Sequence, residues 1–239
     1  MTPKAAMAVH RVVATTTTRK PFVHVYWLKR PTTTTSSTSS TSSTTSTSAW
    51  RDAVLKKYVK GDFQIGLEPK GKPFLLSSSS SLHFNVTHSD SLLGIAVASD
   101  LVGLDTEEER KRRRNKTNVL KLSKRRFSSM EVAQLEALPV EGDARLRRFL
   151  ELWTLKESFL KATGLGISSP VGLRHCTFAF ADDDDNDNDV GRRRRKRLSF
   201  GLDSKAAEAA ADQMVYDDDD DETRLLRADD WRYCVYEPK

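Results

Sequence analysis

Apolar residues occur along this chain in two kinds of run, and long polar stretches separate them. Apolar positions at helical spacing predict helices over 50–59, over 128–138 and over a longer segment that ends near Gly164. Ser128 and Glu131 have the spacing of a capping box at the start of the second helix. Helices mixed with strands indicate an α/β (α+β) fold. Short runs rich in β-branched and aromatic residues predict the strands, at 22–28, 82–87, 92–98, 101–105, 176–180, 198–202 and 231–236.

The long helix carries a buried side and a polar one. Trp153, Glu157 and Lys161 follow one another at i, i+4 and i+8, so they share one face. Trp153 is expected to pack in the core beside the polar pair. Other apolar positions recur at helical spacing and predict the buried side, formed by Leu152, Leu155, Phe159 and Ala162.

Two further carboxylates lie on the predicted strand at 101–105 and just beyond it. Asp105 and Glu107 are two residues apart, so an extended backbone projects both to the same side. Mg²⁺ is commonly held by a few carboxylates together with substrate phosphates, and a lysine beside it would neutralise phosphate charge. With Glu157 and Lys161, the set indicates a metal-bound diphosphate substrate. Taken singly, each segment is more often a solvated charged surface, so only the combination indicates a site.

The N-terminal stretch mixes Lys, Arg and Thr and has no acidic residue. This composition is typical of transit peptides and of disordered tails, so we expect a disordered or transit-like tail over 1–20. The expected location is cytoplasmic, with a plastid or mitochondrial location as the organellar alternative.

The remaining chain is expected to form two parts. An N-terminal α/β half is expected over 21–100, in which the Ser/Thr tract at 32–48 cannot bury apolar surface and is expected to be disordered. A C-terminal α/β half that carries the metal site is expected over 101–239. Runs of Asp and Arg repel themselves and predict charged loops at 182–197 and 217–222.

Cysteine usage and hydropathy argue against a disulfide-rich or cysteine-metal protein and against a membrane-spanning one. Cys176 and Cys234 fit neither a metal-ligand pattern nor a disulfide framework, and both lie in apolar runs, so we expect reduced, buried thiols. No apolar run approaches the length of a membrane span, so no membrane association is expected.

Five segments in order resemble a known family. VGLDTEE at 102–108 and WTLKESFLK at 153–161 are similar to the paired signature of Sfp-type 4′-phosphopantetheinyl transferases (holo-acyl-carrier-protein synthases). GKPFL at 71–75, FNVTHSD at 84–90 and KRRFSSMEVAQL at 124–135 resemble further motifs of this family, in its order. The resemblance implies two similar α/β halves related by a pseudo-twofold axis, with the active site between them, and a monomer.

The resemblance also implies a reaction. A serine of an apo acyl or peptidyl carrier protein would receive the 4′-phosphopantetheine arm of coenzyme A, with Mg²⁺ bridging the diphosphate. The implied metal ligands are Asp105, Glu107 and Glu157. Glu157, or a metal-bound water beside it, would also act as the base, and the implied catalytic residues are Glu157, Lys161 and His88. The residues implied to bind coenzyme A are Lys72, Pro73, Thr87, His88 and Lys161. Lys156 receives no role, because one of two lysines on a helix often faces solvent.

The chain departs from the family pattern at three places. The Ser/Thr tract replaces much of a helix whose cations hold the nucleotide of the coenzyme. Thr87 replaces a serine and keeps the hydroxyl, and Thr106 replaces an aliphatic residue between the two strand carboxylates.

These departures leave two alternatives to an active transferase. One is a catalytically impaired relative that binds carrier protein. A basic nucleic-acid-binding protein is the other, through the basic stretch at 110–126. No aromatic residues interleave with those charges, so we favour an acidic carrier protein as their partner and expect no nucleic acid.

Overall fold

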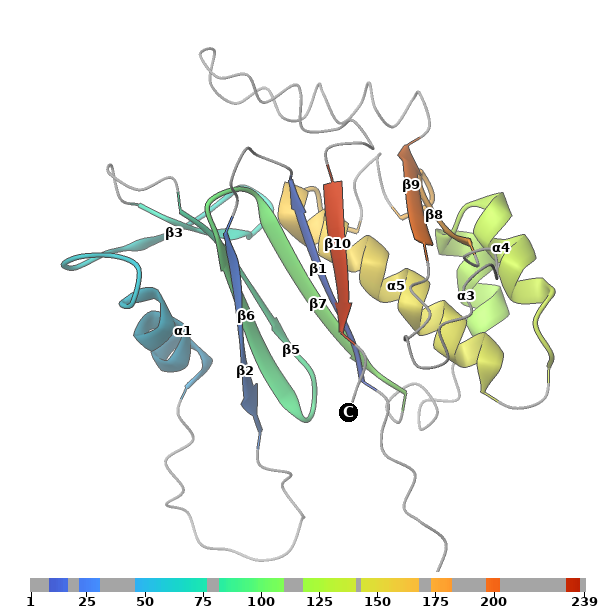
Figure 1. The fold of residues 1–239 in the computed structure, drawn as a ribbon, viewed down its shortest axis with the longest axis horizontal. Coiled ribbons are helices and arrows are strands. Elements are labelled where there is room, and N and C mark those ends of the chain that lie inside the picture. Colours follow the sequence, from blue (N-terminus) through green and yellow to red (C-terminus); the bar gives the residue numbers. More distant parts are fainter. Residues whose placement is uncertain are drawn as a thin grey trace, which may run out of the picture.

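Figure 1 shows a computed structural model of the protein, which describes residues 9–16, 22–30, 46–76, 82–109, 118–140, 143–167, 173–181, 197–202 and 231–236. The helices bounded within these ranges are α1 (Thr47–Leu55), α3 (Val119–Arg126), α4 (Ser129–Glu136) and α5 (Ala144–Thr163). The strands bounded within them are β1 (Val9–Thr16), β2 (Val23–Lys29), β3 (Ile65–Leu67), β4 (Pro73–Leu75), β5 (His83–His88), β6 (Leu92–Ala98), β7 (Val102–Glu108), β8 (Cys176–Ala181), β9 (Arg197–Leu202) and β10 (Trp231–Tyr236). The fold is mixed α/β, as the sequence predicts.

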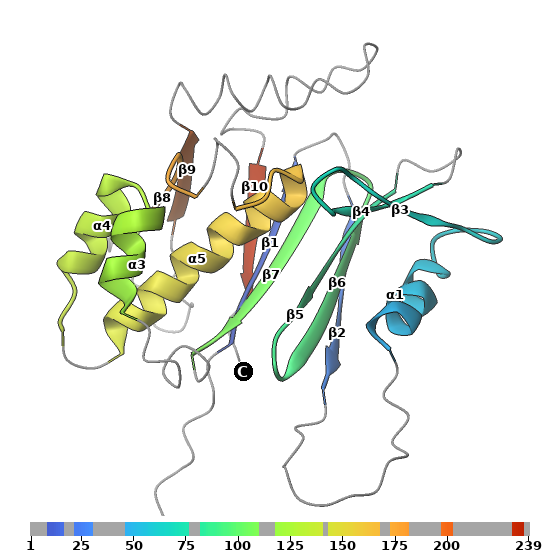
Figure 2. The same ribbon diagram turned by 180° about the vertical axis from the view of Figure 1, so that it is seen from behind.

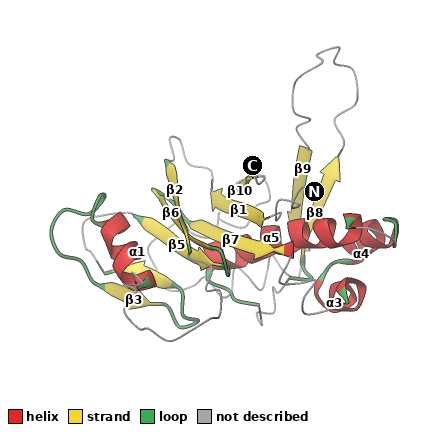
Figure 3. Cartoon of the chain, turned by 90° about the horizontal axis from the view of Figure 1, so that it is seen from below, coloured by secondary structure: helices red, strands yellow, loops and turns green. Residues whose placement is uncertain are grey.

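Two three-stranded antiparallel sheets lie side by side at the centre of the molecule. Their strand orders are β2-β6-β5 and β10-β1-β7. Helix α1 lies beside the first sheet, and α5 crosses one side of the second (Figures 1 and 2). Helices α3 and α4 lie at the opposite end of the molecule from α1, next to the short sheet of β8 and β9 (Figure 3). This arrangement leaves β5 and β7 as the facing edges of the two central sheets.

The first sheet is formed largely as its sequence predicts. The segments predicted at 82–87 and 92–98 form the β5–β6 hairpin, and β2 pairs with the other side of β6. Helix α1 begins inside the tract predicted to be disordered over 32–48, because the Ser46 side chain accepts a hydrogen bond from the Ala49 amide (3.1 Å) and caps the helix. The part of that tract before Ser46 lies outside the described residues.

The prediction of a disordered or transit-like tail over 1–20 is wrong for residues 9–16. These residues form β1, which pairs with β7 on one side and β10 on the other. Their sequence, VHRVVATT, is rich in β-branched residues, which suit a strand. The sheet that carries Asp105 therefore takes a strand from outside the C-terminal half predicted over 101–239.

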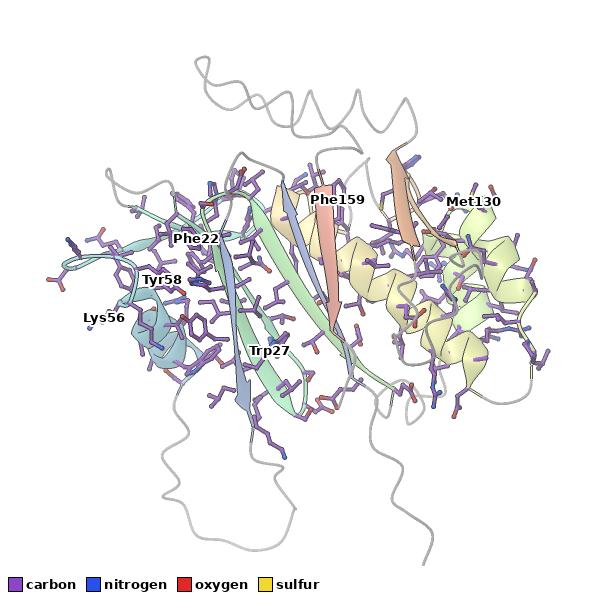
Figure 4. All side chains as sticks on the ribbon, viewed as in Figure 1. Phe22, Trp27, Lys56, Tyr58, Met130 and Phe159 are labelled. Carbon is purple, nitrogen blue, oxygen red and sulfur yellow. The ribbon has the colours of Figure 1, made fainter. Side chains whose placement is uncertain are left out.

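Helix α5 packs along β7 at close range because of one glycine. A Cβ atom at Gly103 would overlap the carbonyl oxygen of Ser158 and the amide nitrogen of Ala162. The face of β7 that carries Gly103 therefore lies against α5, and alternation places Asp105 and Glu107 on that same face. The opposite face of β7 packs against the first sheet, where Figure 4 shows Trp27 between β2 and β7.

The largest core cluster surrounds α5, as its helical spacing predicts. All four apolar positions predicted to be buried are buried, and Trp153 packs with the rings of Phe127 and Phe149. Helix α4 carries the predicted capping box between Ser128 and Glu131. Helix α5 ends, as predicted, at Gly164 in the left-handed conformation (φ 70°). The buried members of this cluster are Phe127, Leu135, Phe149, Leu150, Leu152, Trp153, Leu155, Phe159, Leu160, Ala162, Leu165, Leu173, Cys176 and Phe178.

Some predictions fall on residues without a description. The charged loops predicted at 182–197 and 217–222 lie outside the described residues, except for Arg197, where β9 begins. The side chain of Cys234 on β10 is likewise not described, whereas Cys176 is a buried free thiol.

Across the helices that are described, none combines the length and apolarity that a membrane crossing requires.

Thr106 provides a test of how strand β7 is packed. It is 4% exposed, and its hydroxyl oxygen has no hydrogen-bond partner within the described part of the chain. A buried hydroxyl without a partner is destabilising, so Thr106→Val is expected to stabilise the protein by about 1 kcal/mol. Thr154→Val is the matched control, because the Thr154 hydroxyl donates to Leu150 O (2.7 Å) and its loss should destabilise. Urea denaturation measures both, and a less stable Thr106→Val protein would contradict this description of the strand.

Candidate active site

Three predicted site residues meet where the facing edges of the two sheets come together. Lys161 Nζ on α5 donates to Asp105 Oδ1 on β7 (2.6 Å) and to Thr87 Oγ1 on β5 (3.1 Å). Thr87 Oγ1 lies 3.5 Å from the same Asp105 oxygen. The Thr87 and Asp105 side chains are buried, and that of Lys161 is about one-third exposed. One helix and both sheets therefore position this group.

The facing edges are joined by Asn85, from the same predicted motif as Thr87. Its buried side-chain oxygen accepts a hydrogen bond from the Leu104 amide (2.9 Å), a backbone donor on the edge of the second sheet. Asn85 and Thr87 are two residues apart on β5 and so point to the same side. Together they fix Asp105 against the first sheet.

The two other predicted metal ligands lie close in sequence to this group but do not complete a metal cluster. Glu107 is half-buried on the α5-facing side of β7, and Glu157 is half-buried one helical turn before Lys161. Among the described residues, no three His, Cys, Asp or Glu side chains are arranged to hold a metal ion. Carboxylates repel one another, and the charge of Asp105 is neutralised by Lys161 instead.

The carboxylate of Asp105 nevertheless fits a hard cation. Its Oδ2 atom is buried and has no hydrogen-bond partner within the ranges that the structure describes. Mg²⁺ takes oxygen ligands of this kind, and Glu107 projects to the same side of the strand. The oxygen donors of these residues are therefore compatible with the predicted ion.

His88 lies at the end of β5, directly after Thr87. Its side chain is exposed, and the turn that follows it is bound to β7 through Glu108. His88 therefore stands one residue beyond Thr87, the member of the group that β5 contributes.

The predicted nucleotide-binding segment lies at the C-terminal end of α5. Lys72, in the turn between β3 and β4, donates to the carbonyl oxygen of Ala162. A Cβ atom at Gly164 would overlap Glu68 of the same turn. Pro73 begins β4 and is half-buried. The turn is thus held against the helix end one residue beyond Lys161, and Lys72 satisfies one of the terminal carbonyl groups of α5.

Lys156 has a role that the sequence prediction missed. Its side chain is fully buried, and Nζ lies 2.7 Å from Glu131 Oε2 and 2.6 Å from Leu173 O. Glu131 also caps α4 and accepts a hydrogen bond from the Phe178 amide (2.9 Å). This buried pair joins α4, α5 and β8. The sequence does hold a signal for this burial, because Lys156 lies four residues after Leu152 and so falls within the apolar side of the helix.

The thiol of Cys176 lies beside this pair. Burial raises its pKa to about 11, against a lowering effect of the Lys156 charge. Because the thiolate is the reactive form of cysteine, the buried thiol is inert at neutral pH, as the sequence predicts for a reduced core cysteine.

Comparison with known proteins identifies the part of the chain that holds α5 and β7. Residues 101–212 match the family model of the 4′-phosphopantetheinyl transferase superfamily. The matched residues include Asp105 and Lys161 of the assembled group, together with the two other predicted carboxylates, Glu107 and Glu157.

Individual relatives carry the same description. The chain is 32% identical over 123 residues to the 4′-phosphopantetheinyl transferase Sfp of Bacillus subtilis (51% of each chain). It is 36% identical over 111 residues to the 4′-phosphopantetheinyl transferase HetI of Nostoc (45% of this chain, 44% of the relative). It is 35% identical over 113 residues to the L-aminoadipate-semialdehyde dehydrogenase-phosphopantetheinyl transferase of Xenopus laevis (41% and 34%). The chain therefore spans between about a third and a half of the length of these relatives.

Proposed function

We propose that this protein transfers the 4′-phosphopantetheine arm of coenzyme A to a serine of an apo acyl or peptidyl carrier protein. The observation that carries the proposal is the contact of Lys161 with Asp105 and Thr87, which joins three motifs of the superfamily at one place. The names of the relatives, all of them phosphopantetheinyl transferases, support the same reaction.

The proposed ligands of Mg²⁺ are Asp105, Glu107 and Glu157. The buried, unpartnered oxygen of Asp105 supports this choice. When bound, the ion would neutralise charge on the diphosphate of coenzyme A. Two residues are proposed to contact the phosphates, namely His88 and Lys161, whose amine donates to Asp105 in this structure. The coenzyme site is proposed to be lined by Lys72, Pro73 and Thr87.

The proposed reaction is a substitution at phosphorus. The hydroxyl oxygen of the carrier serine attacks the β-phosphorus of coenzyme A, and a new P–O bond forms. The bond from that phosphorus to the bridging oxygen breaks, and adenosine 3′,5′-bisphosphate leaves. The serine proton passes to Glu157 or to a water beside it. Reactions of this kind depend mainly on positioning and on neutralising charge around phosphorus, which the described cations can supply.

A cationic surface next to α5 supports an acidic carrier as the partner. The last turn of α3 carries Lys124, Arg125 and Arg126, and α3 packs against α5. Opposite charge steers protein partners toward one another. We also propose that the two halves are related by a pseudo-twofold axis, which is supported by the three antiparallel strands of each central sheet.

Intact-mass spectrometry tests the proposed function. The protein is incubated with coenzyme A, Mg²⁺ and a panel of apo carrier proteins, and at least one carrier should gain the mass of the phosphopantetheine arm. Carriers whose acceptor serine is replaced by alanine, and reactions with a chelator, are the controls. No mass gain on any carrier would defeat the proposal. Calorimetric titration with coenzyme A then distinguishes an active transferase from a catalytically impaired relative. The impaired relative, with a damaged pocket, would not bind coenzyme A.

A further inference from the structure

The turn after His88 is bound to β7 by one buried carboxylate. Glu108 is 2% exposed, and its Oε1 atom accepts hydrogen bonds from three donors. These donors are the Ser89 hydroxyl, the Ser91 amide (2.8 Å) and the Ser91 hydroxyl (2.6 Å). Hydrogen bonds to a charged acceptor are the stronger kind, so Glu108 is the main attachment of this turn to the second sheet.

The same turn is held from the first sheet as well. Arg30, directly after β2, donates from Nη1 to Ser89 O (2.9 Å) and from its amide to Ser91 O (2.8 Å). Within the turn, the Ser89 amide donates to Leu92 O (2.8 Å), and the Leu92 amide donates to the Ser89 hydroxyl (3.2 Å). Both backbone and side chains of the turn are thus fixed on two sides.

His88 lies between two attachments to the same strand. The residue before it, Thr87, is bound to the pair of Asp105 and Lys161, and the residue after it, Ser89, is bound to Glu108. Asp105 and Glu108 are three residues apart on β7, so both ends of the short segment around His88 are fixed to one rigid element. The His88 side chain is exposed, but its backbone is attached on both sides and therefore has little freedom to move relative to Asp105.

We propose that Glu108 is a positioning residue for His88, which sets the place of the imidazole relative to Asp105 and Lys161. The inference rests on the proposed function in one respect, namely that His88 contacts coenzyme A. Removing the carboxylate leaves three donors without their acceptor and detaches the turn from β7, so that Arg30 holds it from the first sheet alone and His88 is displaced. A residue that only stabilises the fold would act independently of His88.

A double-mutant cycle distinguishes these two roles. Glu108→Leu is measured in the wild-type background and in His88→Ala, with the KM for coenzyme A as the readout. We expect Glu108→Leu to raise this KM about tenfold in the wild-type background and less than about twofold in His88→Ala. Glu109→Leu is the matched control, because Glu109 is the next buried carboxylate but pairs with Arg147 (3.0 Å) instead of the turn. Its effect should be the same in both backgrounds.

An equal effect of Glu108→Leu in both backgrounds, or no effect in the wild type, would overturn the proposal. If Glu108→Leu does not fold, the double variant Ser89→Ala/Ser91→Ala removes the side-chain donors and is judged by the same two outcomes. If the wild-type protein binds coenzyme A without transferring the arm, the proposed function fails, and the cycle is read from calorimetric affinities for coenzyme A. Additive affinities, or no binding at all, would then overturn the role of Glu108.

Discussion

Replacing Lys156 with methionine is expected to lower the free energy of unfolding by about 3–5 kcal/mol. The change leaves Glu131 as a fully buried carboxylate without its cation, at the junction of α4, α5 and β8. Removing one partner of a buried ion pair is far more destabilising than removing an exposed one. Urea denaturation monitored by tryptophan fluorescence measures the difference.

The chain offers a matched control for this prediction. Lys124 also pairs with a glutamate of α4, Glu136 (2.8 Å), but both side chains are about half exposed. Lys124→Met should change stability by less than about 1 kcal/mol. The double variant Lys156→Met/Glu131→Leu should recover part of the loss, because no uncompensated charge remains. A loss below about 1 kcal/mol in Lys156→Met would show that Glu131 tolerates isolation, contrary to this account.

The variant Glu157→Gln is expected to lose transfer activity at least about 100-fold while it keeps the fold. Glu157 is half-buried on the polar side of α5, and the amide retains its size, so the packing of the helix is preserved. The negative charge proposed to bind the ion and to take up the serine proton is lost. Mass spectrometry of the carrier gives the rate, and urea denaturation gives the stability of the same sample.

Glu151→Gln is the control for this second prediction. Glu151 lies on the same helix and is also partly exposed, but it interacts with Arg148 (3.4 Å), away from Asp105 and Lys161. Its replacement should leave transfer close to the wild-type rate. Full activity in Glu157→Gln would remove Glu157 from the site and leave Asp105 and Glu107 as the proposed carboxylates.

The sequence predicted features whose signals lie within a few neighbouring residues. The strands predicted at 82–87 and 92–98, the Ser128 capping box and the Gly164 end of α5 each depend on local backbone chemistry, and each is confirmed. The strand at 9–16 was missed because the absence of acidic residues was given more weight than its β-branched pattern. Strand assignment of such a segment depends on the neighbours with which it pairs, and both neighbours are distant in sequence.

The candidate site was predictable in part for the same reason. The family resemblance placed Asp105, Thr87 and Lys161 in one site, and the structure brings them together. The roles of Lys156 and Glu108 were not foreseen, because each is defined by partners on other elements. Spacing alone does not show which of two lysines on one helix, or which of two adjacent carboxylates, turns inward.

The pairing of β1 with both β7 and β10 has a consequence for how the protein is made. Strand β10 hydrogen-bonds only to β1 within the described part of this sheet, and β1 in turn borders the strand that carries Asp105. These contacts join segments that are distant in sequence, and contacts of such long range form slowly. On the ribosome, the sheet that carries Asp105 therefore stays incomplete until residues 231–236 have emerged, because β1 has its second neighbour only then.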